Sequence, residues 1–275
     1  MKITILQAGY CTCPEHLAIQ GGAWRGIPFP AMFALLEHPH FGPLLFDTGY
    51  SYRFFAETST YPNRVYRWLT PVTLKEEQLA VNQLSALNLK PSDITHIFIS
   101  HFHADHIAAL ADFNRARYVY LPQAYEAVRA SRGLRAMLRA FLPGLIPGDF
   151  EARSAPVDIY HPVPLPPEYA PFTKGYDLLG DGSLLAVELP GHAVGQMGLF
   201  VHGDNGQTSF FVADAAWLAR SVNEDRPPHA LANLLFSDPK AYRATLSDLH
   251  KIRVDQPGVN IIPSHCAETL AQIIT

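Results

Sequence analysis

Cysteine, clustered basic residues and long apolar runs are all scarce in this chain of 275 residues. The three cysteines, Cys11, Cys13 and Cys266, are too few and too irregularly spaced for a disulfide framework or a zinc ribbon. The 21 Lys and Arg are scattered and are outnumbered by 25 Asp and Glu, giving a formal net charge of -4. Because this charge offers no basic surface to a phosphate backbone, we expect no nucleic-acid partner.

Apolar runs are too short for a membrane protein. None approaches the roughly 20 residues of a membrane-spanning helix. The opening residues "MKITILQAG" lack the apolar core of a signal peptide. We therefore expect a cytoplasmic protein with no integral membrane association. No low-complexity stretch or linker interrupts the chain, and its 48% hydrophobic content can fill a large core. This predicts one domain spanning residues 1–275.

Short apolar strands and amphipathic helices alternate in both halves of the chain. Strands are predicted at residues 2–9, 32–38, 42–49, 94–100, 117–122, 176–192, 197–203, 208–215 and 259–265. Helices are predicted at residues 73–89, 107–113, 123–145 and 239–252. Runs of strands followed by helices in each half predict an α/β protein with two sheets covered by helices.

The string "SHFHADH", residues 100–106, follows the apolar run "HIFI" and contains three histidines and one aspartate. Three later apolar strands also end in a metal-type residue, in "PGH", "FVAD" and "IIPSH". At a strand end, a rigid element can hold a ligand while the next loop gives access. The resulting candidate metal ligands are His101, His103, Asp105, His106, His192, Asp214 and His265.

The spacing of these residues suits two metal ions. His101 and His103 lie two residues apart, so on an extended segment both imidazoles project to one side. Asp105 and His106 lie just past the strand, where a turn directs them to a second position. Two ions with about four N or O ligands each need about seven protein groups if one carboxylate bridges. A solvated loop is the alternative for "HFHADH" alone, and the three downstream residues argue against it.

These motifs, "HxHxDH" with "FDTG" upstream and "PGH", "AD" and "SH" downstream, resemble the metallo-beta-lactamase superfamily of hydrolases. The resemblance covers nearly the whole chain. It implies a four-layer αβ/βα sandwich of two mixed β-sheets flanked by helices, with two divalent ions at the edge between the sheets. Zinc is the usual metal of this family, although His and Asp ligands also accept Fe, Mn or Co.

The resemblance also implies a role for each candidate. The first ion would be bound by His101, His103 and His192. The second would be bound by Asp105, His106 and His265, and Asp214 would bridge the two. Asp47 in "LLFDTG" would orient a ligand histidine without binding metal. A simple turn aspartate before Gly49 is the alternative reading of that position.

Within the superfamily, the sequence is most similar to N-acyl homoserine lactonases, which degrade quorum-sensing signals. The similarity rests on "LQAGYC", "FPAMFALLEHPHFGPLLFDTG", "THIFISHFHADH", "DAAW" and "IIPSHCAE". Two positions depart from that pattern: Ala108 and Ala109 follow Ile107 where lactonases have an "AGG" type segment, and Trp217 replaces a tyrosine. Trp217 and Phe102 are the candidate substrate-pocket residues.

The predicted reaction is hydrolysis of a small ester or lactone. Two divalent ions that share a water lower its pKa from about 15.7 toward 7, so a hydroxide is available at neutral pH. It would attack a carbonyl carbon whose oxygen one ion polarises. Asp105 or a metal-bound water would return the proton to the leaving alkoxide, which makes Asp105 and Asp214 the catalytic candidates.

Other functions of the same fold stay open. A hydrolase of thioesters or aryl esters would use the same ligands. A mononuclear iron enzyme that oxidises persulfides would use His101, His192 and Asp214 and leave the second position empty. RNA-processing members need an appended arm or basic surface that the sequence lacks. The apolar face of residues 133–148 is expected to pack against the domain or across a homodimer, with a lid or membrane-surface contact as alternatives.

Overall fold

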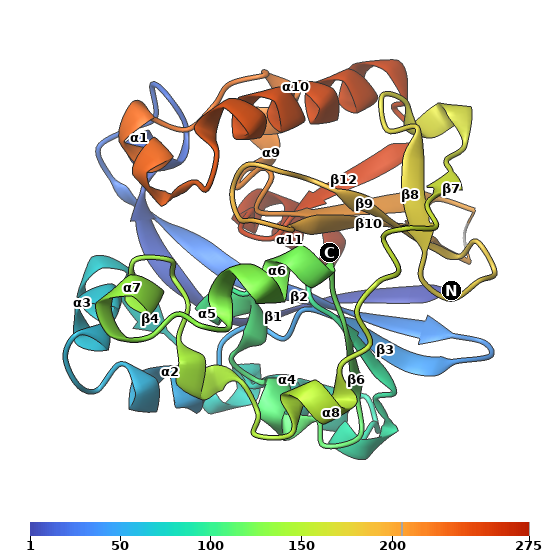
Figure 1. Ribbon diagram of the computed structural model, residues 1–275. Helices are drawn as coiled ribbons and strands as arrows, with labels where there is room; N and C mark the ends of the chain where they lie inside the picture. The colour runs from blue at the N-terminus through green and yellow to red at the C-terminus, as the bar shows by residue number, and fades with distance from the viewer. Residues whose placement is uncertain (205, 275) are drawn as a thin grey trace. The chain divides into compact units, whose positions relative to one another are not determined.

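The computed structural model describes residues 1–204 and 206–274 and divides into two compact units (Figure 1). Unit 1 comprises Met1, Cys13–Ile27 and Val157–Thr275, and unit 2 comprises Lys2–Thr12 and Pro28–Pro156. Each unit contains a six-stranded sheet. Because each unit draws on separated parts of the chain, neither is a simple sequence domain, and a single domain over residues 1–275 stays a prediction.

The sheet of unit 2 has the strand order β4-β1-β2-β3-β5-β6. Its strands are β1 (Lys2–Pro14), β2 (Gly26–His38), β3 (Gly42–Phe46), β4 (Val72–Thr73), β5 (His96–Phe98) and β6 (Arg117–Val119). β2 and β3 pair as an antiparallel hairpin, with Gly42 at φ +74° in its turn. β3, β5 and β6 run parallel, so the residues that follow β3 and β5 emerge at the same edge of the sheet.

The helices of unit 2 are shorter than the sequence predicted. They are α2 (Tyr52–Glu57), α3 (Asn63–Leu69), η1 (Glu76–Gln78), α4 (Ala80–Ala86), η2 (Pro91–Asp93), α5 (Ala104–Ile107), η3 (Leu110–Asp112), α6 (Pro122–Val128), α7 (Gly133–Met137), η4 (Pro143–Leu145) and α8 (Phe150–Arg153). The helix predicted at 73–89 begins only at Ala80, because Leu79 has a non-helical ψ of 135°. The helix predicted at 123–145 is interrupted where Gly133 and Ala140 adopt positive φ angles of 54° and 50°. The segment predicted at 107–113 is also broken, between α5 and η3.

The apolar residues of segment 133–148 largely pack within unit 2. Phe141, Leu142 and Leu145 belong to its hydrophobic core, and each is at most 1% exposed. Leu134 and Leu138 instead face solvent, at 53% and 67% exposure. The predicted packing against the domain is therefore present for the inner residues, whereas a homodimer stays a prediction.

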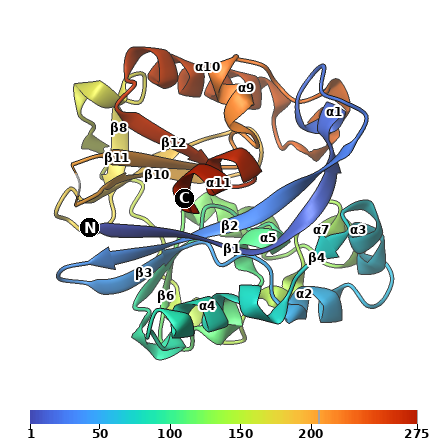
Figure 2. The same ribbon diagram turned by 180° about the vertical axis from the view of Figure 1, so that it is seen from behind.

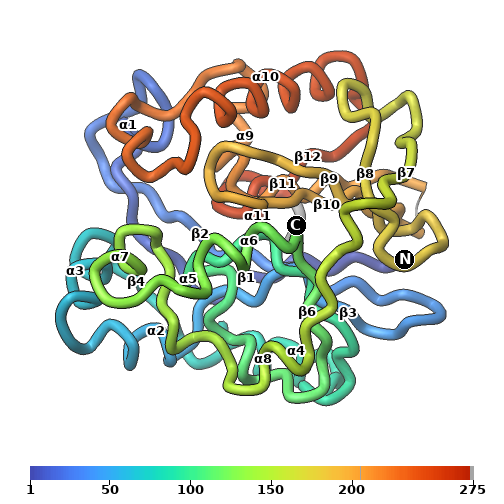
Figure 3. Tube along the Cα trace, viewed as in Figure 1, coloured from blue at the N-terminus to red at the C-terminus, as the bar shows by residue number. Residues whose placement is uncertain are grey.

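The sheet of unit 1 has the order β12-β11-β10-β9-β8-β7. Its strands are β7 (Val163–Pro164), β8 (Lys174–Asp177), β9 (Leu184–Glu188), β10 (Met197–His202), β11 (Thr208–Ala213) and β12 (Val259–Pro263). Strands β7 to β11 are consecutively antiparallel, and β12 joins parallel to β11. The strand predicted at 176–192 is divided into β8 and β9, because Gly180 and Gly182 adopt positive φ angles in a turn between them. Figure 3 follows this part of the chain from yellow to red.

Helices cover this sheet. They are α1 (Glu15–Ala18), η5 (Pro167–Tyr169), α9 (Ala219–Asn223), η6 (Ala230–Leu235), α10 (Pro239–Asp255) and α11 (Ala267–Ile274). Asp238 caps α10 by accepting from the amides of Lys240 and Ala241 at 2.9 and 3.0 Å. α9 and α10 lie on the same side of β12, as seen from behind in Figure 2. The prediction of two mixed sheets flanked by helices is confirmed, and among the described residues no helix has the length and apolarity to cross a bilayer.

Candidate metal centre

The predicted ligands of unit 2 follow β5, and parallel strand pairing explains their position. Phe46 of β3 lies opposite Phe98 of β5, and the amide of Asp47 donates to the Phe98 carbonyl at 2.9 Å. Asp47 and Ser100 therefore meet at the carboxyl edge of the sheet, although they are distant in sequence. This edge is where parallel sheets place their functional side chains.

Three imidazoles cluster beyond this edge. The ring centroid of His101 lies 4.4 Å from that of His103 and 4.2 Å from that of His106. His103 precedes α5, and Asp105 and His106 lie in its single turn, which is the redirection that the sequence predicted. Asp105 Oδ2 lies 3.9 Å from His106 Nε2. Unit 2 thus gathers the four donors predicted from "HFHADH" in one place.

Asp47 contacts the ring of His106, and its orienting role stays a prediction. Its side chain is fully buried, and Oδ2 lies 2.8 Å from His106 Nδ1. The same carboxylate accepts from the amide and the hydroxyl of Ser100, both at 2.8 Å. Because Nδ1 faces Asp47, Nε2 on the other side of the ring faces Asp105 and is the nitrogen suited to bind metal. The contact predicted between Asp47 and a ligand histidine is present. Asp47 also has φ +59°, a left-handed conformation that Asp tolerates better than most residues.

Unit 1 brings together His192, Asp214 and His265, which follow β9, β11 and β12. The Asp214 carboxylate lies between the two imidazoles: Oδ2 is 3.2 Å from His192 Nε2, and Oδ1 is 3.1 Å from His265 Nε2. All three side chains are at most 5% exposed. A buried carboxylate between two imidazoles is a group of donors that suits a divalent metal ion.

The donors in each unit suit divalent metals. Three pairs of residues have ligand atoms within 4.8 Å of each other. They are His101 with His103, Asp105 with His106, and His192 with Asp214. Imidazole nitrogens and carboxylate oxygens are ordinary zinc ligands, and burial strengthens their need for a cation. Side chains of this type at this spacing therefore fit the predicted metal chemistry.

A family model described as the metallo-beta-lactamase superfamily matches residues 35–257, which is most of the chain. The chain belongs to the metallo-beta-lactamase superfamily.

Three relatives of this superfamily protein carry the name N-acyl homoserine lactonase. N-acyl homoserine lactonase AttM of Azorhizobium caulinodans is 25% identical and covers 96% of this chain and 93% of its own length. AttM of Rhizobium radiobacter is 28% identical, with 85% and 83% coverage. AiiA of Bacillus thuringiensis subsp. kurstaki is 24% identical, with 82% and 80% coverage.

Solved structures show the same fold. An N-acyl homoserine lactone hydrolase with N-hexanoyl-L-homoserine bound at its catalytic metal centre has a TM-score of 0.72 at 18% identity, covering 98% of this chain and 95% of its own. AidC, described as a dizinc quorum-quenching lactonase, has a TM-score of 0.66 at 16% identity, with 97% and 87% coverage. The predicted fold, family and class of metal-dependent hydrolase are confirmed.

The two predicted pocket residues of this superfamily member differ in position. Trp217 is 6% exposed, and its Nε1 donates to Asp214 Oδ2 at 3.2 Å, so it touches a predicted metal ligand. Phe102 is 2% exposed and packs against Tyr120 and Phe150 in the core of unit 2. The position of Phe102 favours a packing role, and its place in the substrate pocket stays a prediction.

Sequence reasoning missed Ser100, Phe236 and Tyr242. Ser100 directly precedes His101, and this position beside the predicted ligands was a signal available in the sequence. Phe236 lies 5.7 Å from the His192 ring between centroids and stacks on Tyr242 at 4.0 Å. Only the close approach of α10 to Gly191 brings them there: a Cβ on Gly191 would lie 2.2 Å from Tyr242 Cα. No local pattern could reveal that approach.

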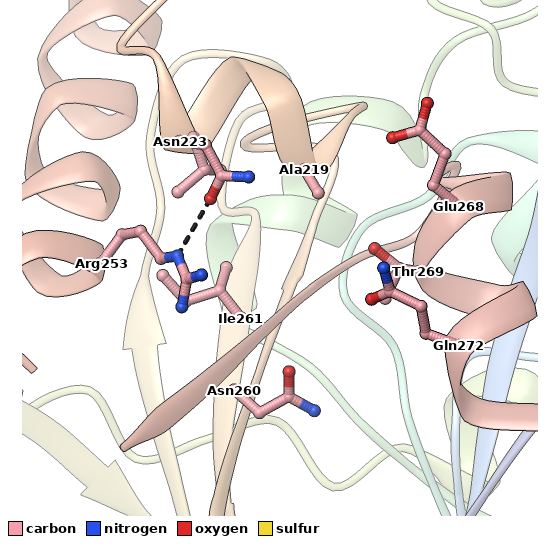
Figure 4. Close-up of a pocket in the computed structure, with 9 residues that line it drawn as sticks. Ala219, Asn223, Arg253, Asn260, Ile261, Glu268, Thr269 and Gln272 are labelled. Carbon is pink, nitrogen blue, oxygen red and sulfur yellow. Dashed lines mark hydrogen bonds between the residues drawn. The ribbon is translucent and has the colours of Figure 1, made fainter. Parts of the chain in front are cut away.

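A polar pocket of about 200 Å³ lies elsewhere in unit 1, between α9, α11, the end of α10 and β12 (Figure 4). Arg253 Nε donates to Asn223 Oδ1 at 3.0 Å at one side of it. Glu268, Thr269 and Gln272 of α11 line the other side. Because none of the predicted metal ligands lines this pocket, we do not place the reaction there.

Proposed function

We propose that this chain is a binuclear metal-dependent hydrolase that opens lactones, with N-acyl homoserine lactones as the first candidates. The observation that carries the proposal is the Asp214 carboxylate, whose two oxygens lie 3.2 and 3.1 Å from the imidazole nitrogens of His192 and His265. The names of the lactonase relatives supply the substrate class.

We assign the ligands as the family pattern implies. One ion would be held by His101, His103 and His192, the other by Asp105, His106 and His265, with Asp214 shared between them. Zinc is the first metal to test. When bound, such a pair of ions supplies a hydroxide nucleophile at neutral pH and polarises the carbonyl oxygen of the substrate.

The protein's own groups supply orientation and proton transfer. Asp47 holds the His106 ring through Nδ1 and so fixes the direction of Nε2. The Asp105 side chain is 12% exposed, whereas those of His106 and Asp214 are at most 5% exposed. We therefore assign to Asp105 the proton transfer that completes ring opening: when hydroxide has added to the carbonyl and the ring C–O bond breaks, Asp105 would take the proton of the new carboxyl group and pass it to the leaving alkoxide.

Exposed apolar residues near His192 support a substrate with an apolar group. Phe236, which contacts the His192 ring, directly follows η6, where Leu234 and Leu235 are 83% and 62% exposed. Trp24 is 88% exposed, and its ring lies 3.9 Å from that of His16 between centroids. The His16 ring lies 6.4 Å from that of His229, the residue before η6, so Trp24 is linked to the same part of unit 1. Exposed apolar side chains that gather in one region are typical of binding surfaces, and an acyl chain would fit this one.

The test measures metal content and hydrolysis together. The purified protein is expected to contain two equivalents of metal and to open acyl homoserine lactones, followed by pH change. Both His106→Ala and Asp214→Ala should abolish hydrolysis, while His161→Ala, a change at a histidine whose side chain is 82% exposed, should not. Full activity without metal would end the proposal. Two equivalents with turnover of aryl esters or thioesters alone would change the substrate, and one iron with persulfide oxidation would replace the reaction.

A further inference from the structure

Trp217 and the predicted metal ligand His192 contact the same carboxylate oxygen of Asp214. Its indole Nε1 donates to Asp214 Oδ2 at 3.2 Å, and the same oxygen lies 3.2 Å from His192 Nε2. An ionised carboxylate has about four lone-pair sites, so it can accept from an indole and still present lone pairs to metal. The indole therefore approaches the carboxylate without excluding a ligand role for it.

The position of the indole is held by neighbouring rings. The Trp217 ring centroid lies 5.4 Å from that of Phe236 and 5.9 Å from that of His192. Phe236 in turn lies 5.7 Å from His192 and stacks on Tyr242 of α10 at 4.0 Å and 14°. Tyr242 is buried, and its backbone lies against Gly191, so α10 holds Phe236 and, through it, the Trp217 ring in place.

We propose that Trp217 is a positioning residue that fixes the carboxylate of Asp214 and the ring of His192 for metal binding. This inference rests on the proposed function for the identity of the ligands, and it deepens it by giving the tryptophan that replaces the lactonase tyrosine a different task. An indole has a single N–H. Because that N–H points at Asp214, the side chain acts on the metal ligand rather than on the carbonyl oxygen of the substrate.

The magnitude follows from the nature of the contact. Groups that hydrogen-bond to metal ligands typically change metal affinity by about 10- to 100-fold when they are removed. Trp217→Phe keeps an aromatic ring and deletes the N–H. The matched control is Phe236→Leu, which loosens the packing around Trp217 and keeps the N–H donor.

The experiment titrates metal-free wild type and both variants with Zn²⁺ against a competing chelator, and records the visible spectrum of each protein loaded with Co²⁺. Trp217→Phe is expected to weaken Zn²⁺ binding by about 10- to 100-fold and to change the Co²⁺ spectrum. Phe236→Leu should lower the thermal midpoint of the metal-free protein with a smaller loss of affinity. Unchanged Zn²⁺ affinity in Trp217→Phe, combined with a raised KM, would place the N–H on the substrate and overturn the inference.

A measurement on the wild type covers the case in which Trp217→Phe does not fold. The sequence has three tryptophans, and Trp24 and Trp68 are 88% and 63% exposed. Each of the variants Trp24→Phe and Trp68→Phe removes one indole N–H resonance from the NMR spectrum, and the signal that remains in both belongs to Trp217. The Trp217 signal should be protected from hydrogen exchange and stay protected in the Zn²⁺-loaded protein. Loss of protection on Zn²⁺ loading, or a shift only when ring-opened product is added, would contradict the inference.

The Zn²⁺ affinity, the Co²⁺ spectrum and the exchange protection are measured without lactone turnover, and only the KM comparison needs it. Failure of the lactone panel with intact Trp217 protection and a large affinity loss in Trp217→Phe would remove the proposed substrate and keep the positioning role. Turnover of lactones with no effect of Trp217→Phe on Zn²⁺ affinity would keep the proposed substrate and remove the positioning role.

Discussion

Replacement of Asp47 by Asn separates its two readings, an orienting aspartate and a simple turn residue. Asn is nearly isosteric and tolerates the φ of +59° found at this position. Its amide can still interact with Ser100. The atom that lies 2.8 Å from His106 Nδ1, however, is a carboxylate oxygen in the wild type and becomes an oxygen or nitrogen of a neutral amide in the variant.

The expected magnitude comes from these contacts. A hydrogen bond to a charged group contributes about 1.5–3 kcal/mol, and a neutral one about 1 kcal/mol. Weakening the His106 contact from a charged to a neutral hydrogen bond should lower the free energy of unfolding of the metal-free protein by about 0.5–2 kcal/mol. The affinity for Zn²⁺ should fall by about 10- to 100-fold, because His106 loses the partner that orients it.

The assay pairs urea unfolding of the metal-free protein with Zn²⁺ titration against a chelator. The matched control is Asp177→Asn. Asp177 accepts from the amides of Gly180 and Gly182 at 2.9 Å in a turn of unit 1, with no histidine in those contacts. It should cost stability without affecting Zn²⁺ binding. If Asp47→Asn binds Zn²⁺ within twofold of wild type, Asp47 is only a turn residue and the reasoning fails.

Three further results are expected. Removing metal by dialysis against chelator should lower the thermal midpoint, since a ligand at 1,000 times its Kd stabilises by about 4.1 kcal/mol; an unchanged midpoint would argue against a tightly held ion. Gly191→Ala should destabilise unit 1 by several kcal/mol because its Cβ would overlap Tyr242 and its φ is +130°, and a urea midpoint equal to wild type would contradict that packing. In wild type, kcat/KM is expected to rise from butanoyl to decanoyl lactones, and the double change Leu234→Ser with Leu235→Ser should reduce that rise. Val254→Ser changes an exposed residue near the end of α10, about 22 Å along the helix from its first residue, and should leave the rise unchanged.

The local sequence pattern was sufficient to predict strands and candidate ligands, because these depend on residues that are close together in the chain. The apolar runs that became β5, β10, β11 and β12 are strands because buried, β-branched and aromatic residues favour them. The metal-type residues that follow β5, β9, β11 and β12 could be recognised from residue type and spacing alone, and the superfamily followed from their order. Helix lengths were overestimated for the opposite reason: apolar periodicity at 73–89 and 123–145 continues through Leu79 and Ala140, where the backbone leaves the helical region.

The sequence by itself determined which residues are candidate ligands, because each lies directly after an apolar strand and carries a donor atom. The tertiary structure decided what surrounds them. Asp47 and His106 are 59 residues apart and meet only because β3 and β5 are parallel neighbours. Trp217 turned out to face Asp214, and Phe102 to face the core, because packing rather than spacing sets where a side chain points.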